Sequence, residues 1–333
     1  MQSRFPVILG TLLALVALAA ALFGVSVAPW VLGPSLHGDA LEDGWMDVEV
    51  WANLDSEAPA NAEALLKAEM AVERQAAALD ALGESARSRT NAGVREKDIP
   101  EEGRIALRAL EQWDASGADL GDQTCGEALQ PLHLLTTGRL LLAVAGKNAS
   151  APEIDRVLRL AAALRTSGDL RLVAIGYNLA EEIVDWVEAR GGKPGPIFAE
   201  LRPRTEEFFL AAARDAVCTW RKASKAAAKG GMPELLKGLS ADAAPPWVRP
   251  MMKPERELKM LQAFHVERLH AAWKDRTELG LLRVHLRVPP VTDLPKSALV
   301  RGWVTDPGMV LDRGREVFDT YTAFLKQHQI ERP

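Results

Sequence analysis

A run of 22 residues without an ionisable side chain, residues 7–28, constrains most strongly what this 333-residue chain can fold into. As an α-helix the run would be about 33 Å long at ~1.5 Å per residue, close to the ~30 Å hydrocarbon thickness of a bilayer. A helix inside a soluble protein normally keeps a polar face. The run therefore predicts a transmembrane helix, with the membrane as the binding partner of residues 7–28.

A cleaved secretory signal peptide is the alternative for the same run. Arg4 provides a basic start, and Ser26-Val27-Ala28 has the small-x-small pattern of a cleavage site. The apolar stretch is longer than the ~7–15 residues of a signal peptide, and Pro29 would directly follow the cut. Trp30 stands where an interfacial aromatic residue anchors a spanning helix. We therefore predict a retained anchor over residues 1–32, and cleavage stays open as the alternative.

The charges around the run predict its orientation. Residues 5–66 contain no Lys or Arg, whereas their ionisable residues are all acidic apart from one histidine. Basic residues near a span stay on the cytoplasmic side, so we expect a cytoplasmic N-terminus and a periplasmic body. The Ala-, Leu- and Arg-rich composition is typical of a GC-rich bacterial genome. The predicted location is therefore a bacterial inner membrane.

The charge of the remaining chain excludes one class of partner. Residues 67–333 contain 39 of the 40 Lys and Arg residues and 37 of the 45 Asp and Glu residues, and are nearly neutral. No basic field favours nucleic acid.

Along the chain we predict a cytoplasmic stub and anchor (1–32), an acidic tether (33–54), an α-helical domain (55–279) and a strand-turn-helix extension of the same body (280–333).

The pattern after the tether is helical almost without interruption. We expect helices at residues 61–82, 100–113, 126–146, 150–167, 169–190, 205–229, 254–279 and 312–329. Helical spacing of apolar residues predicts one inward face on helix 150–167 and one on helix 169–190. These faces contain Ile154, Val157, Leu158, Ala161 and Leu164, and Leu172, Ile175, Leu179, Ile183, Trp186 and Val187. Short connections between such helices predict antiparallel helical hairpins. Alternating apolar and basic residues at 282–288 indicate a strand of a small β-hairpin, and residues 45–51 alternate enough for a short strand or a surface strip. The predicted fold class is mainly α.

Two cysteines, Cys125 and Cys218, are the only thiols of the chain. An even number in an exported protein predicts a disulfide, and two independent buried thiols are the alternative. In the predicted helix 205–229, Cys218 points about half a turn away from the apolar stripe that contains Phe209, Ala216 and Trp220. That orientation favours the bridge.

No catalytic or metal-binding motif is present. Glu267 and His270 have the E-x-x-H spacing of di-iron bundles, but such a site needs a second pair and two more glutamates. The acidic row Glu181, Asp185 and Glu188 is interpreted as a solvated helix face. The nucleophile and phosphate-loop motifs of known enzymes are absent, and we expect no cofactor.

Two sets of polar residues remain as weak candidates. His133, Arg139 and Tyr177 lie on apolar helices, where a buried charge requires a partner, and they predict either polar core contacts or a ligand site. Arg283, His285 and Arg287 alternate along the possible edge strand. They predict either strand addition by an acidic partner segment or the solvent face of an ordinary hairpin.

These observations favour a function without identifying an activity. We predict a single-pass, membrane-anchored, periplasm-facing helical protein that serves as a protein-interaction or scaffold component of a bacterial envelope. An enzyme or small-ligand-binding protein with a site of scattered polar residues is the alternative.

An apolar loop around Trp247 and Met251-Met252 is predicted to dock either on the core or on a partner.

Overall fold

The computed structural model of the chain describes residues 15–18, 21–22, 28–34, 38–54, 62–86, 94–114, 131–146, 152–237, 239, 243–274, 286–290, 293–304 and 306–330. All regular elements in these residues are helical, and no strand occurs among them. This confirms the predicted mainly α fold. The elements are α2 (Ala28–Val31), α3 (Asp39–Ala52), α4 (Ala62–Arg74), α5 (Ala76–Ala86), η1 (Glu96–Asp98), α6 (Glu101–Asp114), α8 (Pro131–Ala145), α9 (Pro152–Arg165), α10 (Leu170–Ala189), α11 (Ile197–Glu200), α12 (Thr205–Leu235), η3 (Arg249–Met251), α13 (Pro254–Lys274), α15 (Ala298–Trp303) and α16 (Gly308–Gln327).

The chain forms two compact units, each built from three separate stretches of sequence. Unit 1 contains residues 1–45, 219–267 and 288–304, and unit 2 contains residues 46–218, 268–287 and 305–333. Each unit therefore needs distant parts of the chain to complete its core.

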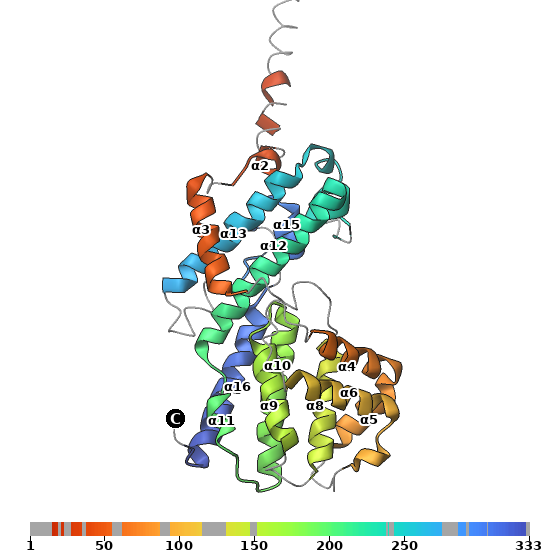
Figure 1. Ribbon diagram of the computed structural model, residues 1–333. Helices are drawn as coiled ribbons and strands as arrows, with labels where there is room; N and C mark the ends of the chain where they lie inside the picture. Colours follow the sequence, from red (N-terminus) through yellow and green to blue (C-terminus); the bar gives the residue numbers. More distant parts are fainter. Residues whose placement is uncertain are drawn as a thin grey trace, which may run out of the picture. The chain divides into compact units, whose positions relative to one another are not determined.

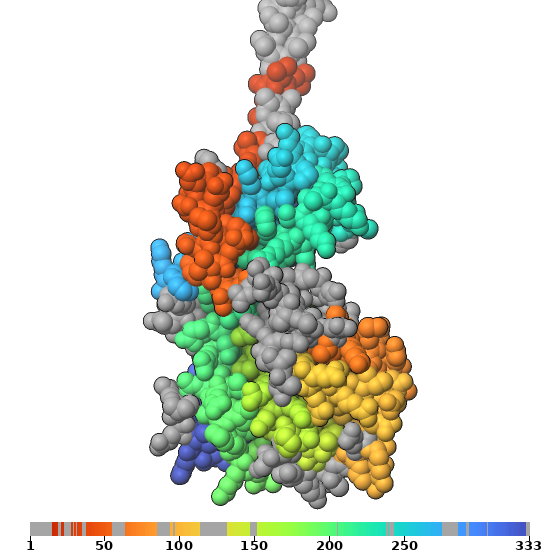
Figure 2. Space-filling model, viewed as in Figure 1, coloured from red at the N-terminus to blue at the C-terminus, as the bar shows by residue number. Residues whose placement is uncertain are grey.

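Unit 2 is a bundle of helices, and several of its contacting pairs are not consecutive in the chain (Figure 1). Helix α9 packs against α10, α16 lies along α10, and α8 contacts both α9 and α10. Helices α4, α5 and α6 pack on α8, and Figure 2 shows their orange and yellow surface lying against the yellow-green surface of α8. Among the described helices, α8, α9 and α10 pack on their neighbours in sequence as the predicted hairpins require, whereas α4 pairs with α6 and α5 with α8.

The predicted apolar faces of α9 and α10 are confirmed. All of their predicted inward residues are buried, which are Ile154, Val157, Leu158, Ala161 and Leu164 on α9 and Leu172, Ile175, Leu179, Ile183, Trp186 and Val187 on α10. The two helices approach closely at Gly176, where a Cβ would lie 2.7 Å from the Arg165 backbone nitrogen. Backbone atoms fill that space, so the position requires glycine.

Unit 1 has two small cores. One surrounds Leu261 and Phe264 of α13, and its other buried members are Ala223, Leu235, Leu294, Leu299 and Val300. The second core consists of Trp30, Ala244, Val248, Met252 and Ala298. Unit 1 thus relies on residues from α2, α12, α13, α15 and the segment before η3.

The structure does not support the predicted transmembrane helix. Most of residues 7–28 lie outside the described residues, and no helix in the described part of the chain is long and apolar enough to cross a membrane. Trp30, predicted as an interfacial anchor, is instead 4% exposed in the second core of unit 1, with the Arg301 guanidinium 5.3 Å from its ring centroid. The predicted anchor, its membrane partner and the inner-membrane localisation are therefore not supported.

Both strand predictions are wrong for the residues described. Residues 45–51 belong to helix α3, whose buried residues Leu41, Trp45 and Val48 follow a helical spacing. In the second case Leu286 is helical and buried and Arg287 lies in a bend, while residues 281–285 lie outside the described part. A short alternating stretch carries too little periodicity to separate the two structures.

Cys218 does not lie on a polar face of its helix, which was the argument for the bridge. Its side chain is buried at 1% exposure, because α12 is enclosed on nearly all sides at residues 213–218. The cysteine is not a free thiol. Cys125 lies outside the described residues, however, so the partner of Cys218 is not described and the predicted Cys125–Cys218 bridge is not confirmed.

Candidate functional site

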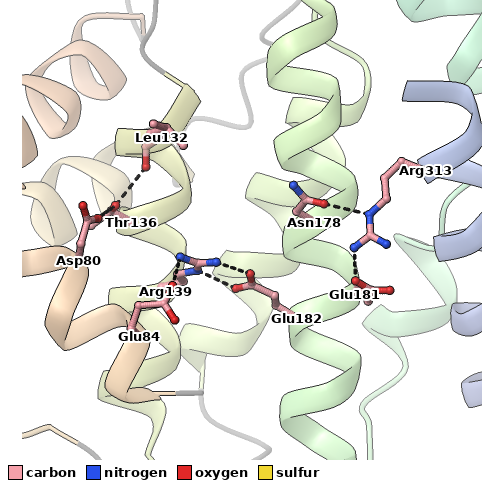
Figure 3. Close-up of polar contacts among 9 residues, drawn as sticks. All are labelled: Asp80, Glu84, Leu132, Thr136, Arg139, Asn178, Glu181, Glu182 and Arg313. Atoms are coloured by element: carbon pink, nitrogen blue, oxygen red, sulfur yellow. Dashed lines mark hydrogen bonds and ion pairs between the residues drawn. The ribbon is translucent and has the colours of Figure 1, made fainter. Parts of the chain in front are cut away.

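Arg139, the first predicted polar candidate, joins three helices of unit 2 (Figure 3). Its Nε and Nη2 donate to the two carboxylate oxygens of Glu182 on α10 at 2.9 and 2.6 Å, and Nη1 donates to Glu84 on α5. The hydrogen bond with Glu182 raises the pKa of Arg139 above its ordinary value, with burial opposing and the nearby carboxylates adding to the rise. The guanidinium therefore acts as an interhelical clamp.

A second ion pair ties α16 to α10 (Figure 3). Arg313 donates from Nε to the Asn178 side-chain oxygen at 3.0 Å and from Nη2 to Glu181. In the predicted acidic row, Glu181 pairs with Arg313, and Asp185 and Glu188 have exposed side chains. Within the described ranges, no three His, Cys, Asp or Glu side chains are grouped to hold a metal ion.

His133 and His270 each lie beside a carboxylate. The His133 Nδ1 lies 4.0 Å from a carboxylate oxygen of Glu69, in a largely buried position. Glu267 is exposed, and the His270 Nε2 lies 3.5 Å from a carboxylate oxygen of Asp47. The His270 ring also packs on Trp51, with a centroid distance of 4.7 Å.

Tyr177, the third candidate, lies in a different and deeper cluster. Its ring stacks on Phe208 with a centroid distance of 5.3 Å, and both its ring and the nearby Tyr321 are buried. Beside them Arg165, only 1% exposed, donates from Nε to Glu207 at 2.8 Å and from Nη2 to the Leu201 carbonyl oxygen at 2.7 Å. The structure therefore groups Tyr177 with Arg165, whereas Arg139 and His133 make their contacts elsewhere.

Three polar atoms of this cluster are buried without a hydrogen-bond partner among the described residues: Arg165 Nη1, Tyr177 OH and Tyr321 OH. Burial alone would lower the pKa of Arg165, but the charge and hydrogen bonds of Glu207 raise it above its ordinary value. Such a guanidinium remains charged and keeps two N–H groups available for an oxygen acceptor.

The two tyrosines, which are the only ones in the chain, give a first prediction. Burial raises the pKa of each phenol, and the charge of Glu207 adds to the rise while that of Arg165 opposes it. The unfolded chain therefore loses phenol protons from about pH 10 upward while the folded chain keeps them, so stability falls as pH rises above ~10. In an alkaline titration followed by phenolate absorbance, we expect no ionisation before the helical circular dichroism is lost. Phenolate absorbance at pH 10 in the folded protein would contradict the buried cluster.

The candidate partner residues Arg283, His285 and Arg287 are described only in part. Arg283 and His285 lie outside the described residues, and Arg287 donates from Nη2 to the Asp312 carboxylate at 3.3 Å. With no strand in the described part of this segment, the observations do not support strand addition by a partner.

The apolar loop around Trp247 has two alternating sets of side chains, and we name residues 243–252 the proline-rich turn. Val248 and Met252 are buried in the second core of unit 1. Trp247 and Met251, by contrast, are 55% and 38% exposed. The turn thus docks on the core with one face and presents an apolar pair to solvent with the other.

Backbone hydrogen bonds and prolines hold the proline-rich turn in one conformation. The amides of Val248, Met251 and Met252 donate to the carbonyls three residues earlier at 2.9–3.2 Å, and Arg249 Nε donates to the Ala244 carbonyl at 3.1 Å. Pro245, Pro246 and Pro250 each fix one backbone φ. The exposed pair therefore sits on an ordered support.

Sequence reasoning missed Arg165, because an arginine in the last turn of a helix is an ordinary exposed residue in sequence. Its ion-pair partner Glu207 is 42 residues away. The alanines that precede Arg165 on α9 gave no indication that its side chain is buried.

No protein-family model, no curated protein and no solved structure matches this chain.

Proposed function

We propose that this chain is a helical protein-binding protein, acting as a scaffold or assembly component, and that the proline-rich turn is its contact surface. The observation that carries the proposal is the exposed pair Trp247 and Met251 on an ordered turn. Tryptophan, methionine and arginine are enriched in the centres of protein interfaces. This turn contains one of each: Trp247, Met251 and Arg249.

Order in the free turn favours tight binding. A tryptophan on a flexible loop loses backbone and side-chain freedom when it binds, whereas the prolines and hydrogen bonds of this turn have already restricted the backbone. Exposing a tryptophan to water has no stabilising effect on the fold itself. A partner surface that covers Trp247 and Met251 would explain why both occupy exposed positions.

The roles of the other candidates support a binding function over the enzymatic alternative. Arg139 and Arg313 are engaged in ion pairs that connect helices. His133 contacts a single carboxylate, Glu69. Each of these residues has a structural explanation that requires no reaction.

The test is recovery of a partner with variants of the turn. Trp247→Ala should leave the thermal unfolding of the protein unchanged, because the side chain is mostly exposed, and should weaken partner binding about 30-fold, the size of an interface hot spot. Affinity purification of the tagged full chain from its own cells measures both partner identity and yield. Met309→Ala is the matched control, since Met309 is 84% exposed on α16. Equal recovery of every partner with Trp247→Ala would contradict the proposal.

A further inference from the structure

Helix α3 presents an exposed face with an apolar centre and an acidic rim. On a helix of about 100° per residue, Met46 and Val50 lie along the middle of this face, and their side chains are 55% and 74% exposed. Exposed carboxylates lie on both sides of the pair. We name this set the acidic face, and it consists of Asp39, Glu42, Asp43, Met46, Asp47, Glu49 and Val50.

Helix α12 presents a surface of the opposite charge. Residues 216–233 contain four cations and no Asp or Glu. The side chains of all four are exposed, and we name them the basic stripe: Arg221, Lys222, Lys225 and Lys229. Lys229 lies 3.8 Å from a Glu234 carboxylate oxygen, whereas Lys222 and Lys225 form no ion pair with another described residue. The middle of the stripe is therefore available to carboxylates of another molecule.

The acidic face and the basic stripe are complementary in charge and in apolar surface. Lysine side chains have long apolar stems, so Lys222 and Lys225 can cover Met46 and Val50 while their ammonium groups reach the carboxylates of the rim. Residues 5–66 contain no Lys or Arg that could neutralise the acidic face from its own segment. Opposite charges of this kind fix the register of a contact and speed its formation.

The two surfaces of one copy point in different directions. Helix α3 packs on α12 through Trp45 and Trp220, whose ring centroids are 5.6 Å apart. On α3 the acidic face lies opposite the buried side that contains Trp45, and on α12 the lysines of the basic stripe lie about half a turn from Trp220. One copy therefore cannot satisfy its own acidic face, and a contact between the two surfaces joins separate copies.

We infer that copies of this chain assemble head to tail, with the acidic face of α3 on one copy against the basic stripe of α12 on the next. Different surfaces meet in such a contact, so repetition gives an open chain or a ring. The assembly is independent of the proposed contact through the proline-rich turn, and Trp247→Ala should leave it unchanged.

The first test is sedimentation velocity of the full chain at about 100 μM, where a contact with a micromolar Kd is largely formed. We expect an average mass about twice that of one copy or more in about 20 mM NaCl, and the mass of one copy in about 500 mM NaCl, because salt screens exposed charges. Association through the apolar residues 7–28 would persist at high salt. Monomers at low salt, or association that high salt does not weaken, would overturn the inference.

Charge reversal identifies the surfaces. Glu42→Lys/Asp43→Lys and Lys222→Glu/Lys225→Glu each replace attraction with repulsion, so each variant alone should associate about tenfold more weakly or less. A mixture of the two variants retains one intact acidic face and one intact basic stripe. We expect the mixture to form one-to-one pairs and nothing larger, and we expect a chain with all four substitutions to assemble again.

Matched reversals elsewhere provide the control. Lys259→Glu/Lys326→Glu and Glu255→Lys/Asp319→Lys change the net charge equally at exposed positions outside both surfaces, and both should assemble as the original chain does. Circular dichroism verifies that every variant is folded. Assembly that survives either reversal on the two surfaces, equal loss with the control reversals, or a mixture that stays monomeric would each contradict the head-to-tail contact.

Discussion

Replacing Arg165 with alanine is expected to lower the free energy of unfolding of unit 2 by about 3–5 kcal/mol, the usual cost of removing one partner of a buried ion pair. The change leaves the Glu207 carboxylate without its charge partner and the Leu201 carbonyl oxygen without its donor. It also opens space beside two buried phenols. The shift of the urea unfolding transition, followed by circular dichroism, measures the loss.

The control for Arg165 is Arg171→Ala. Arg171 also pairs with a carboxylate, Asp169, but its side chain is 62% exposed, and exposed pairs contribute only about 0–1 kcal/mol. If the two variants lost the same stability, the burial assigned to Arg165 would be wrong.

Replacing Glu257 with alanine is expected to destabilise unit 1 by a similar amount, about 3–5 kcal/mol. Glu257 is fully buried, and one of its carboxylate oxygens accepts from the Ser297 hydroxyl at 2.8 Å and from the Ala298 amide at 2.7 Å. The other accepts from Arg256. Glu257 on α13 therefore caps the first turn of α15, and its removal leaves buried donors and a buried cation unsatisfied.

Two further variants separate the contributions at this position. Glu255→Ala removes an exposed carboxylate from the same helical turn and should cost only about 0.3–1 kcal/mol. Glu257→Gln keeps an oxygen acceptor but not the charge, so its loss of stability should lie between those of the two alanine variants. Urea unfolding of all three proteins gives the ranking, and a tolerated Glu257→Ala would contradict the described core of unit 1.

Local periodicity was sufficient to predict most helices. The 3.6-residue pattern of α9 and α10 identified the buried face of each helix, because both helices pack with one side on neighbours and keep polar residues on the other. The same reasoning failed for α12 at Cys218, since residues 213–218 are buried or half-buried on every side even though they include the charged Arg214 and Asp215.

The first thirty residues show the limit of composition. Trp30 was predicted to lie at a membrane interface from its place after the apolar run, but it packs in a core with Val248 and Met252, more than two hundred residues away. The strand prediction for residues 45–51 was wrong for a different reason. Their alternation concealed the helical spacing of Leu41, Trp45 and Val48, a signal that was present in the sequence.

The candidate site was predictable only in part. Arg139 and Tyr177 were recognised as polar groups on apolar helices, and both are largely enclosed. Neither Arg165 nor Glu257 was recognised, because each resembles an ordinary charged residue near a helix end and its partner comes from another helix about forty residues away. Pairings of that kind depend on tertiary packing, which local patterns do not encode.

Site-specific photo-crosslinking most directly tests the claim that this protein works by binding another protein through the proline-rich turn. A photoreactive amino acid replaces Trp247, Met251 or Met309 in the full chain, and the cells are irradiated. We predict that positions 247 and 251 yield a crosslink to the same protein and that position 309 does not. Absence of an adduct from positions 247 and 251, or the same adducts from all three positions, would contradict the claim.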